Sequence, residues 1–434
     1  MEQRTVYSHE IYAKGLLAEQ IDIVLNNIER LREIIETISK RQLPKNWYPY
    51  NSKCGNPECH SLMDTVSYDY EHPYVKYKCE KCGHEGQADI RTDDGKLPWR
   101  IDWPARWAAL GVTCEPFGKD HAASGGSYAT GEVISKELFD YEPPHPVVYE
   151  WIQLKGKGAM SSSKGVVVVG SEMIKMTPPE VLRFMITKLN PGKHIDFDPG
   201  LGILNLVDEY DRYEATFYGV SEAQADPDQN RALVLAQADL DKLMEHVESM
   251  KVNPDATFDI TLKETDMPRQ IPYRHMVTLS QLAQEKDAFI SVVERAENLK
   301  LDELTDEEKD RLWTRLECVR YWLENFAPED VKFSVVDSVS PDVVSQFDAD
   351  DIDRLEILRD ILTDTSWDAE AIHKAFYAAG EKTNEKAKPY FRLAYLALLA
   401  KERGPRLGFF LSSLEKDFVI GLLDQALQQQ QGQQ

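Results

Sequence analysis

Apolar residues recur at helical spacing near the start of the chain. Between residues 11 and 40 the large aliphatic side chains fall three or four positions apart: Ile21, Val24, Leu25, Ile28, Leu31, Ile34, Ile35 and Ile38. This spacing places one apolar face on an α-helix. Pro44 follows, and proline cannot continue a helix. The pattern therefore predicts a helix over residues 11–40 that ends before Pro44.

The apolar pattern then changes. Residues 50–95 are rich in Cys, Gly, Tyr and charged residues, with short strand-like runs, and this texture indicates a small inserted module. From Leu97 to about Val169, short β-branched runs alternate with turn residues, as in an α/β sheet domain. We expect strands at Val147–Leu154 and Val166–Val169.

Beyond Gly202 the spacing is helical almost to the end of the chain. Amphipathic stretches cover residues 230–252, 276–298, 306–325, 350–363, 369–380, 383–402 and 413–427. Just before this region, Thr177-Pro178-Pro179-Glu180 precedes an apolar run. It has the form of a capping box, in which Thr177 and Glu180 satisfy the first amides of a helix.

The amino-acid composition limits the classes of protein to which this chain can belong. The 434 residues are 42% hydrophobic and 29% charged, which fits about three globular domains at roughly 150 residues each. No run approaches the ~20 apolar residues that cross a bilayer, and residues 1–5 lack the apolar core of a signal peptide. Six cysteines without such a signal predict a reducing, cytoplasmic location and favour metal binding over disulfides.

The formal net charge is −24. Such a charge argues against attraction of nucleic acid to the whole surface. It leaves room for local lysine and arginine clusters that neutralise phosphates. The excess of acidic residues is otherwise explained by solubility or by a salty habitat.

Four of the six cysteines form two close pairs. Cys54 and Cys59 have four residues between them, and Cys79 and Cys82 have two. Two such pairs can present four thiolates tetrahedrally to Zn²⁺, and a shell of four protein ligands is typical of a structural site. The alternative is four unrelated buried thiols.

A loop rich in Gly, Ser and Lys follows Leu154. It supplies backbone amides, hydroxyls and the mobile ammonium groups of Lys155, Lys157 and Lys164. These groups suit the negative charge that grows on transferring phosphates. A solvated flexible loop would have a similar composition.

Part of this loop resembles the KMSKS loop of class I aminoacyl-tRNA synthetases, in the form typical of the class I lysyl enzymes. The matching residues are Met160, Ser161, Ser162, Ser163 and Lys164. In that family the loop closes over the ATP triphosphate during amino-acid adenylation. The resemblance implies that Lys164 holds the pyrophosphate leaving group, with Lys157 as a helper. Ala159 stands where the family's first lysine usually is, so which ammonium contributes most is left open.

Two upstream stretches resemble the same family. One runs from Leu97 to Trp107, and the other from Phe117 to His121. In class I synthetases a Gly-x-Asp-His-like turn meets the ATP ribose at the carboxyl end of a strand, where open α/β sheets bind ligands. The resemblance implies that Gly118, Asp120 and His121 contact ATP, with Asp120 accepting hydrogen bonds from the ribose.

Trp99, Asp102 and Trp103 suit a lysine substrate. A lysine ammonium needs a counter-charge and tolerates an aromatic face, with cation–π contact contributing ~0.5–2 kcal/mol. We therefore predict that these three residues contact the substrate, with Asp102 as the counter-charge. The alternative is that the tryptophans belong to the core or contact a tRNA stem.

The resemblance continues almost to the carboxyl end. Residues 272–277 and 401–408 resemble the helical anticodon-binding domain of these enzymes. The most basic neighbourhood of the chain lies there: Lys382, Lys386, Lys388, Arg392, Lys401, Arg403 and Arg406. These side chains either contact tRNA phosphates or form a solvated helix face.

One motif of the family is missing from the sequence. Class I synthetases have a His-x-Gly-His-type turn at a helix amino terminus that meets the ATP phosphates. None of the ten histidines lies in that pattern. We expect that the sequence begins inside the catalytic domain and that the chain alone is incomplete for lysine activation. Either the sequence is a truncated gene model or a separate chain carries the first half.

The sequence thus predicts an α/β fold, a partial class I nucleotide-binding domain with a zinc insertion, followed by an all-α anticodon-binding domain. The expected parts are a helical part at 1–48, the zinc-binding insertion at 49–96, the carboxyl-terminal half of a Rossmann-like domain at 97–200 and a helical tRNA-binding domain at 201–434. The predicted activity joins lysine to tRNA(Lys) through a lysyl-adenylate, using ATP and Mg²⁺. The alternatives are a glutamyl-type class I synthetase and a non-catalytic tRNA-binding fragment.

Overall fold

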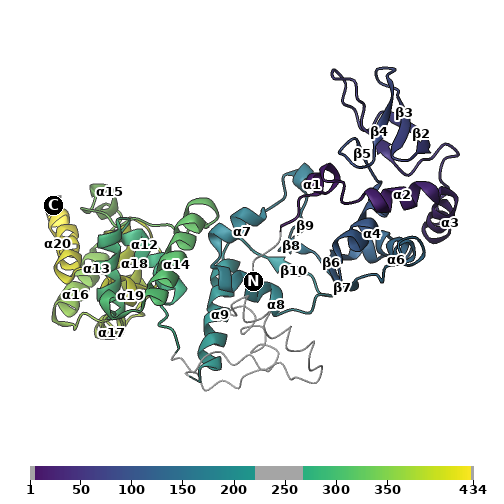
Figure 1. The fold of residues 1–434 in the computed structure, drawn as a ribbon. Coiled ribbons are helices and arrows are strands. Elements are labelled where there is room, and N and C mark those ends of the chain that lie inside the picture. The colour runs from purple at the N-terminus through teal and green to yellow at the C-terminus, as the bar shows by residue number, and fades with distance from the viewer. Residues whose placement is uncertain (1–4, 220–266, 432–434) are drawn as a thin grey trace. The chain divides into compact units, whose positions relative to one another are not determined.

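The computed structural model describes residues 5–219 and 267–431 (Figure 1). The chain divides into two compact units, one of residues 1–152 with 190–195 and one of residues 153–189 with 196–434. Each unit has its own apolar core. The helix expected at 230–252 lies outside the described residues, and the four-part division of the sequence stays a prediction.

The first unit opens with three short helices, so the prediction of one helix over 11–40 is wrong. They are α1 (Ser8–Ala13), α2 (Ala18–Asn26) and α3 (Ile28–Ser39). Gly15, between α1 and α2, has φ +63°, a left-handed conformation that interrupts a helix. A Cβ at Gly15 would also lie 2.8 Å from the backbone oxygen of Arg91, so the close approach requires glycine. The apolar positions that predicted the helix, such as Ile21 and Leu31, are buried.

Residues 51–96 form two small antiparallel sheets (Figure 1). One has the order β2-β3-β4, and the other pairs β1 with β5. The strands are β1 (Asn51–Ser52), β2 (Thr65–Glu71), β3 (Tyr74–Cys79), β4 (Glu85–Asp89) and β5 (Gly95–Lys96). Val75 and Tyr77 of β3 are buried in the same cluster as Ile21 and Leu31 of the helices. The module therefore shares a core with α1–α3.

A strand–helix–strand segment completes most of the first unit. Its elements are α4 (Trp99–Leu110), β6 (Cys114–Gly118), α5 (Lys119–Ala122), α6 (Ser127–Leu138) and β7 (His145–Tyr149). β6 and β7 are parallel, with Gly118 opposite Tyr149. Parallel neighbours need a crossover connection, which here contains α6. Both strands end at the same edge, so the residues after Gly118 and after Tyr149 lie together.

The second unit begins around a three-stranded sheet in the order β10-β8-β9. Its strands are β8 (Ile152–Leu154), β9 (Gly158–Ala159) and β10 (Ile195–Phe197). The expected strand at 147–154 is therefore two strands, β7 and β8. The expected strand at 166–169 is wrong, because only Val166 meets a neighbouring backbone, in a single bridge to Ser161.

Three helices follow: α7 (Gly170–Met176), α8 (Pro179–Thr187) and α9 (Gly202–Phe217). The capping box expected at residues 177–180 is wrong. The residue before a proline avoids helical backbone angles, so Pro179 keeps Pro178 extended at ψ 138° and the helix begins one residue later. Thr177 consequently makes no side-chain cap at the start of α8, and its buried hydroxyl has no hydrogen-bond partner among the described residues. The carboxylate of Glu180 instead lies 3.5 Å from Arg315.

The rest of the described chain is helical, as predicted. The helices are α12 (Tyr273–Leu282), α13 (Lys286–Glu297), α14 (Asp306–Asn325), α15 (Pro341–Val344), α16 (Ala349–Asp364), α17 (Ala369–Lys382), α18 (Lys388–Leu399), α19 (Leu407–Ser412) and α20 (Lys416–Gln431). The stretch expected as one helix at 276–298 is two, because Ala283 has an extended backbone. Within the described residues, no helix has the length and apolarity needed to cross a membrane.

The carboxyl-terminal helices share one core, and Phe410 lies in it fully buried. We expect Phe410→Ala to lower the free energy of unfolding by about 3–5 kcal/mol, because it leaves a cavity among packed side chains. Phe418, on α20, is 37% exposed and is the matched control, so Phe418→Ala should cost much less. Urea denaturation of both variants measures the difference, and equal losses would contradict this packing.

Candidate functional site

The four cysteine sulfurs of residues 54–82 lie together in the first unit. All four lie within 4.8 Å of one another. The sulfurs of Cys54 and Cys82 are 3.6 Å apart, and those of Cys59 and Cys79 are 3.8 Å apart. Four sulfurs placed tetrahedrally at about 2.3 Å from Zn²⁺ would be separated by about 3.8 Å. The thiols are free and have the spacing that a zinc ion requires.

A tight turn after β3 brings the second pair into place. The backbone amide of Gly83 donates to the Cys79 carbonyl at 2.8 Å, and the Cys79 amide donates to the His84 carbonyl at 2.8 Å. Burial raises the pKa of the Cys54 thiol to about 12. The backbone amide of His84 lowers the pKa of Cys82 to about 7, so Cys82 is the more readily ionised of the two.

Trp99, Trp103 and His121 form an aromatic group. Trp99 and Trp103 stack one turn apart on α4, with ring centroids 5.2 Å apart. The His121 ring lies 5.7 Å from Trp99 and 5.4 Å from Trp103. Trp103 is buried edge-on against Phe117, whereas Trp99 is 50% exposed. Trp103 is therefore a core residue, and Trp99 offers an accessible ring beside His121.

Asp102 is buried on α4, and both of its carboxylate oxygens have partners. Arg106 donates from Nε to one oxygen at 2.7 Å, and the Tyr12 hydroxyl donates to the other at 2.5 Å. The same Tyr12 hydroxyl accepts a hydrogen bond from the amide of Leu97 at 3.0 Å. Asp102 thus joins α1 to the start of α4. Each carboxylate oxygen therefore already accepts a hydrogen bond from a side chain of the protein.

The turn at Gly118–His121 follows β6 directly. Asp120 is exposed and forms no ion pair with any described residue. Its neighbour Lys119 pairs with Glu150 at 2.7 Å and lies 5.5 Å from the Trp151 ring centroid. The carboxyl edge of the β6–β7 pair therefore presents a free carboxylate next to a neutralised lysine.

The Gly-, Ser- and Lys-rich loop belongs to the second unit. Backbone hydrogen bonds of 2.7 and 3.1 Å between Ser161 and Val166 close it, and a short 3₁₀ helix, η1 (Ser162–Lys164), lies between them. Lys155 pairs with Asp198 at 3.8 Å. Lys157 and Lys164 are exposed and form no ion pair in the described part of the chain. Two ammonium groups are therefore available to an anion.

The basic residues predicted near the carboxyl end fall into two groups. Arg392 pairs with Asp351 and Glu402, and Lys401 donates to the carbonyl of Lys332. The others are exposed and unpaired with any acidic side chain that the structure describes: Lys382, Lys386, Lys388, Arg403 and Arg406. Exposed cations of this kind can bind phosphates.

Sequence reasoning missed the partners of Asp102. Arg106 lies four residues further along α4, and this i,i+4 spacing was a readable sign of an ion pair. Tyr12 lies 90 residues earlier, and no local pattern relates it to Asp102.

Comparison with known proteins gives a consistent class. The family model for tRNA synthetases class I (K) matches residues 1–239. The lysine–tRNA ligase of Picrophilus torridus is 40% identical over 416 residues, covering 94% of this chain and 74% of that protein. That of Thermoplasma acidophilum is 41% identical over 419 residues, covering 96% and 75%. That of Archaeoglobus fulgidus is 34% identical over 421 residues, covering 97% and 75%.

The fold and these matches define a class I tRNA synthetase with a mostly helical carboxyl-terminal part. The chain belongs to the lysine–tRNA ligase family, so the resemblance found in the sequence is confirmed. The glutamyl-type alternative is not favoured. No finding supports a separate chain that carries the first half. The roles of the individual site residues stay predictions.

The geometry of Asp102 leads to a prediction about stability. Asp102→Asn should lower the free energy of unfolding by about 3 kcal/mol, because it leaves Arg106 without its counter-charge. Asp120→Asn is the matched control on an exposed carboxylate and should change stability by less than about 0.5 kcal/mol. Denaturant unfolding of both variants provides the measurement. An Asp102→Asn protein as stable as the control would show that the ion pair does not hold α4.

Proposed function

We propose that this chain attaches lysine to tRNA through a lysyl-adenylate. The lysine carboxylate attacks the α-phosphorus of ATP, and the bond to the β-phosphate breaks to release pyrophosphate. A tRNA hydroxyl then attacks the adenylate carbonyl, and AMP leaves. The observation that carries this proposal is the exposed loop with Lys157 and Lys164, whose ammonium groups no described carboxylate neutralises. Family membership supports the choice of lysine and tRNA as substrates.

Lys164 holds the leaving pyrophosphate in this proposal, and Lys157 assists it. A fixed positive charge acts most strongly where negative charge develops in the transition state. Met160 begins this segment, and the hydroxyls of Ser161, Ser162 and Ser163 provide further donors. Mg²⁺ bound to the triphosphate would neutralise part of the remaining charge.

The first unit supplies the nucleoside and lysine contacts. Asp120 accepts hydrogen bonds from the ribose hydroxyls, next to Gly118 and His121 at the end of β6. The lysine ammonium meets the exposed ring of Trp99, which stacks on Trp103. Asp102 acts indirectly, because its pairing with Arg106 and Tyr12 fixes the helix that carries both tryptophans.

Zn²⁺ bound by Cys54, Cys59, Cys79 and Cys82 has a structural role in this proposal. Four thiolates fill a tetrahedral shell and leave no position for a reacting water. The buried members Cys54 and Cys79 lie in the core shared with α1–α3, so the metal would hold the inserted strands against those helices.

The carboxyl-terminal helices contact the tRNA. The unpaired cations named above, among them Lys388 and Arg406, bind its phosphates. Tyr377, on α17, is 52% exposed, with the ring of His373 at 5.1 Å, and such a ring can stack on an unpaired base. A cytoplasmic location, where tRNA and ATP are available, goes with this function.

Lysine-dependent ATP–pyrophosphate exchange tests the proposal. The assay contains tRNA throughout and compares lysine, glutamate and no amino acid. We expect exchange above background with lysine only, at a low rate because the sequence contains no His-x-Gly-His-type turn to meet the ATP phosphates. Exchange with glutamate, or none with lysine, would contradict the proposed activity of this chain.

In the same assay Lys164→Ala should lower the exchange rate by about 10²–10³-fold, the usual effect of losing one transition-state donor. Lys155→Ala is the matched control in the same loop, because Lys155 already pairs with Asp198. Equal losses of exchange rate in the two variants would show that Lys164 has no special role.

The zinc proposal predicts about one zinc per chain by elemental analysis. Cys79→Ser should lose the metal and destabilise the first unit, because three sulfurs cannot complete the shell. Cys114→Ser, at an exposed cysteine outside the cluster, should keep the metal. Reduced, folded protein without zinc would refute this role.

A further inference from the structure

Helix α14 lies against the two helices that follow the loop. The Lys175 ammonium on α7 lies 5.5 Å from the centroid of the Tyr321 ring on α14. On α8, Glu180 faces Arg315 of α14 at 3.5 Å and Arg311 at 3.7 Å. The segment after the loop is therefore attached to a helix that comes more than a hundred residues later in the chain.

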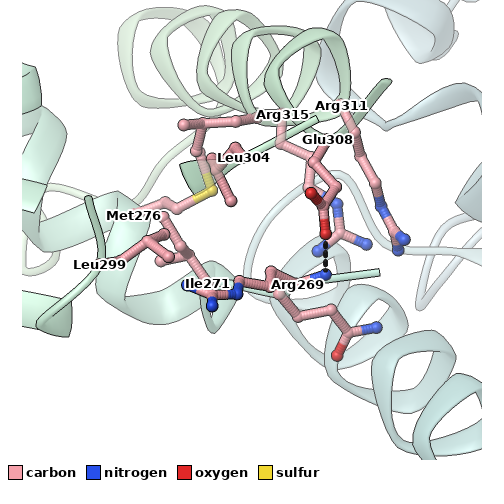
Figure 2. Close-up of a pocket in the computed structure, with 10 residues that line it drawn as sticks. Arg269, Ile271, Met276, Leu299, Leu304, Glu308, Arg311 and Arg315 are labelled. Carbon is pink, nitrogen blue, oxygen red and sulfur yellow. Dashed lines mark hydrogen bonds between the residues drawn. The ribbon is translucent and has the colours of Figure 1, made fainter. Parts of the chain in front are cut away.

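The same two arginines hold α9 much more closely. Arg315 makes a two-pronged pair with Asp211 at 2.6 and 3.1 Å. Arg311 makes a similar pair with Glu214 at 2.6 and 3.0 Å. Such bidentate pairs restrict geometry in two directions. Figure 2 shows that Arg311 and Arg315 come from one helix, beside a small pocket that Glu308 also lines.

This ion cluster is buried and unbalanced. Arg315 is 3% exposed and Glu214 is fully buried. Two guanidinium groups face three carboxylates, those of Glu180, Asp211 and Glu214. Burial raises the pKa of Asp211 although Arg315 lies beside it. Among the described residues of this cluster, the carboxylates outnumber the guanidinium groups.

Glu180 is the third and loosest carboxylate. Its distances to the arginines exceed those of Asp211 and Glu214 by about an ångström. The Nε of Arg311 has no hydrogen-bond partner within the described part of the chain. Glu180 also caps nothing at the start of α8. Its described interactions therefore connect α8 to the α9–α14 pair.

We propose that Glu180 is a positioning residue for adenylation. Its ion pairs with Arg311 and Arg315 fix the position of α8 on α9 and α14. Because α7 and the loop of Lys157 and Lys164 directly precede α8 in the chain, their positions are fixed as well. This inference rests on the proposed function of the loop. Misplacement of a catalytic group by about 1 Å can cost about 10²-fold in rate, so the reaction depends on such a connection.

Glu180→Gln tests this role, with Glu209→Gln as the matched control. Glu209 on α9 pairs at 2.6 Å with Lys188, the residue that follows α8, and it forms no ion pair with α14 among the described residues. Both substitutions keep the size of the side chain and remove one negative charge. Glu180→Gln should lower the unfolding midpoint no more than Glu209→Gln does, because Asp211 and Glu214 remain to pair with the two guanidinium groups.

The first measurement is hydrogen–deuterium exchange of the full chain over residues 155–176. We expect Glu180→Gln to speed amide exchange there about tenfold and Glu209→Gln to leave it within about twofold, since local opening reflects local contacts. The second is the kinetics of lysine activation. Glu180→Gln should lower kcat about tenfold or more and leave the KM for lysine within about twofold, because the lysine contacts belong to the first unit.

Three results would overturn the inference. The first is an unchanged rate of amide exchange over residues 155–176 in the Glu180→Gln protein. The second is an equal effect of the two substitutions on exchange and on kcat. The third is a lower unfolding midpoint of the Glu180→Gln protein together with faster exchange throughout the second unit. If the unaltered protein fails to activate lysine, the proposed function is lost. The exchange measurement still decides whether Glu180 sets the loop.

Discussion

The buried pairing of Arg311 and Arg315 with three carboxylates is the interaction on which the second unit depends. It brings together α8, α9 and α14, which are separated by many residues in the chain. Charges taken out of water are costly, and removal of one partner from a buried pair typically costs about 3–5 kcal/mol. An arrangement of these helices that left one of the buried charges without its partner would be strongly disfavoured. The pairs therefore act mainly by excluding such arrangements. The loop with Lys157 and Lys164 precedes this junction in the chain.

The first unit is organised around a single helix. One side of α4 carries Asp102, which holds Tyr12 and Arg106 in a buried network. Other positions of the same helix carry Trp99 and Trp103, which stack with each other and with His121. The ion pair and hydrogen bonds of Asp102 thus hold the helix on which the stacked tryptophans lie. The direct contact of Asp102 with the substrate stays a prediction.

Local rules failed where a neighbouring residue or a distant contact outweighed them. The helical spacing over 11–40 is real, but Gly15 packs against the backbone of Arg91 and breaks the helix. Thr177 and Glu180 are residue types that a capping box requires at these two positions. Pro179 keeps Pro178 extended, and Glu180 gains two arginine neighbours from α14.

The sequence by itself determined the family, the helical character of the carboxyl-terminal part and the cysteine spacing that brings four sulfurs together. It also located the loop with Lys157 and Lys164. These features depend on residues close together in the chain, where spacing and composition are direct physical constraints. Only the tertiary structure brought Asp102 and Glu180 to their partners. Their partners lie 90 residues away for Tyr12 and 135 for Arg315, and no periodicity in a sequence encodes a contact between segments so far apart.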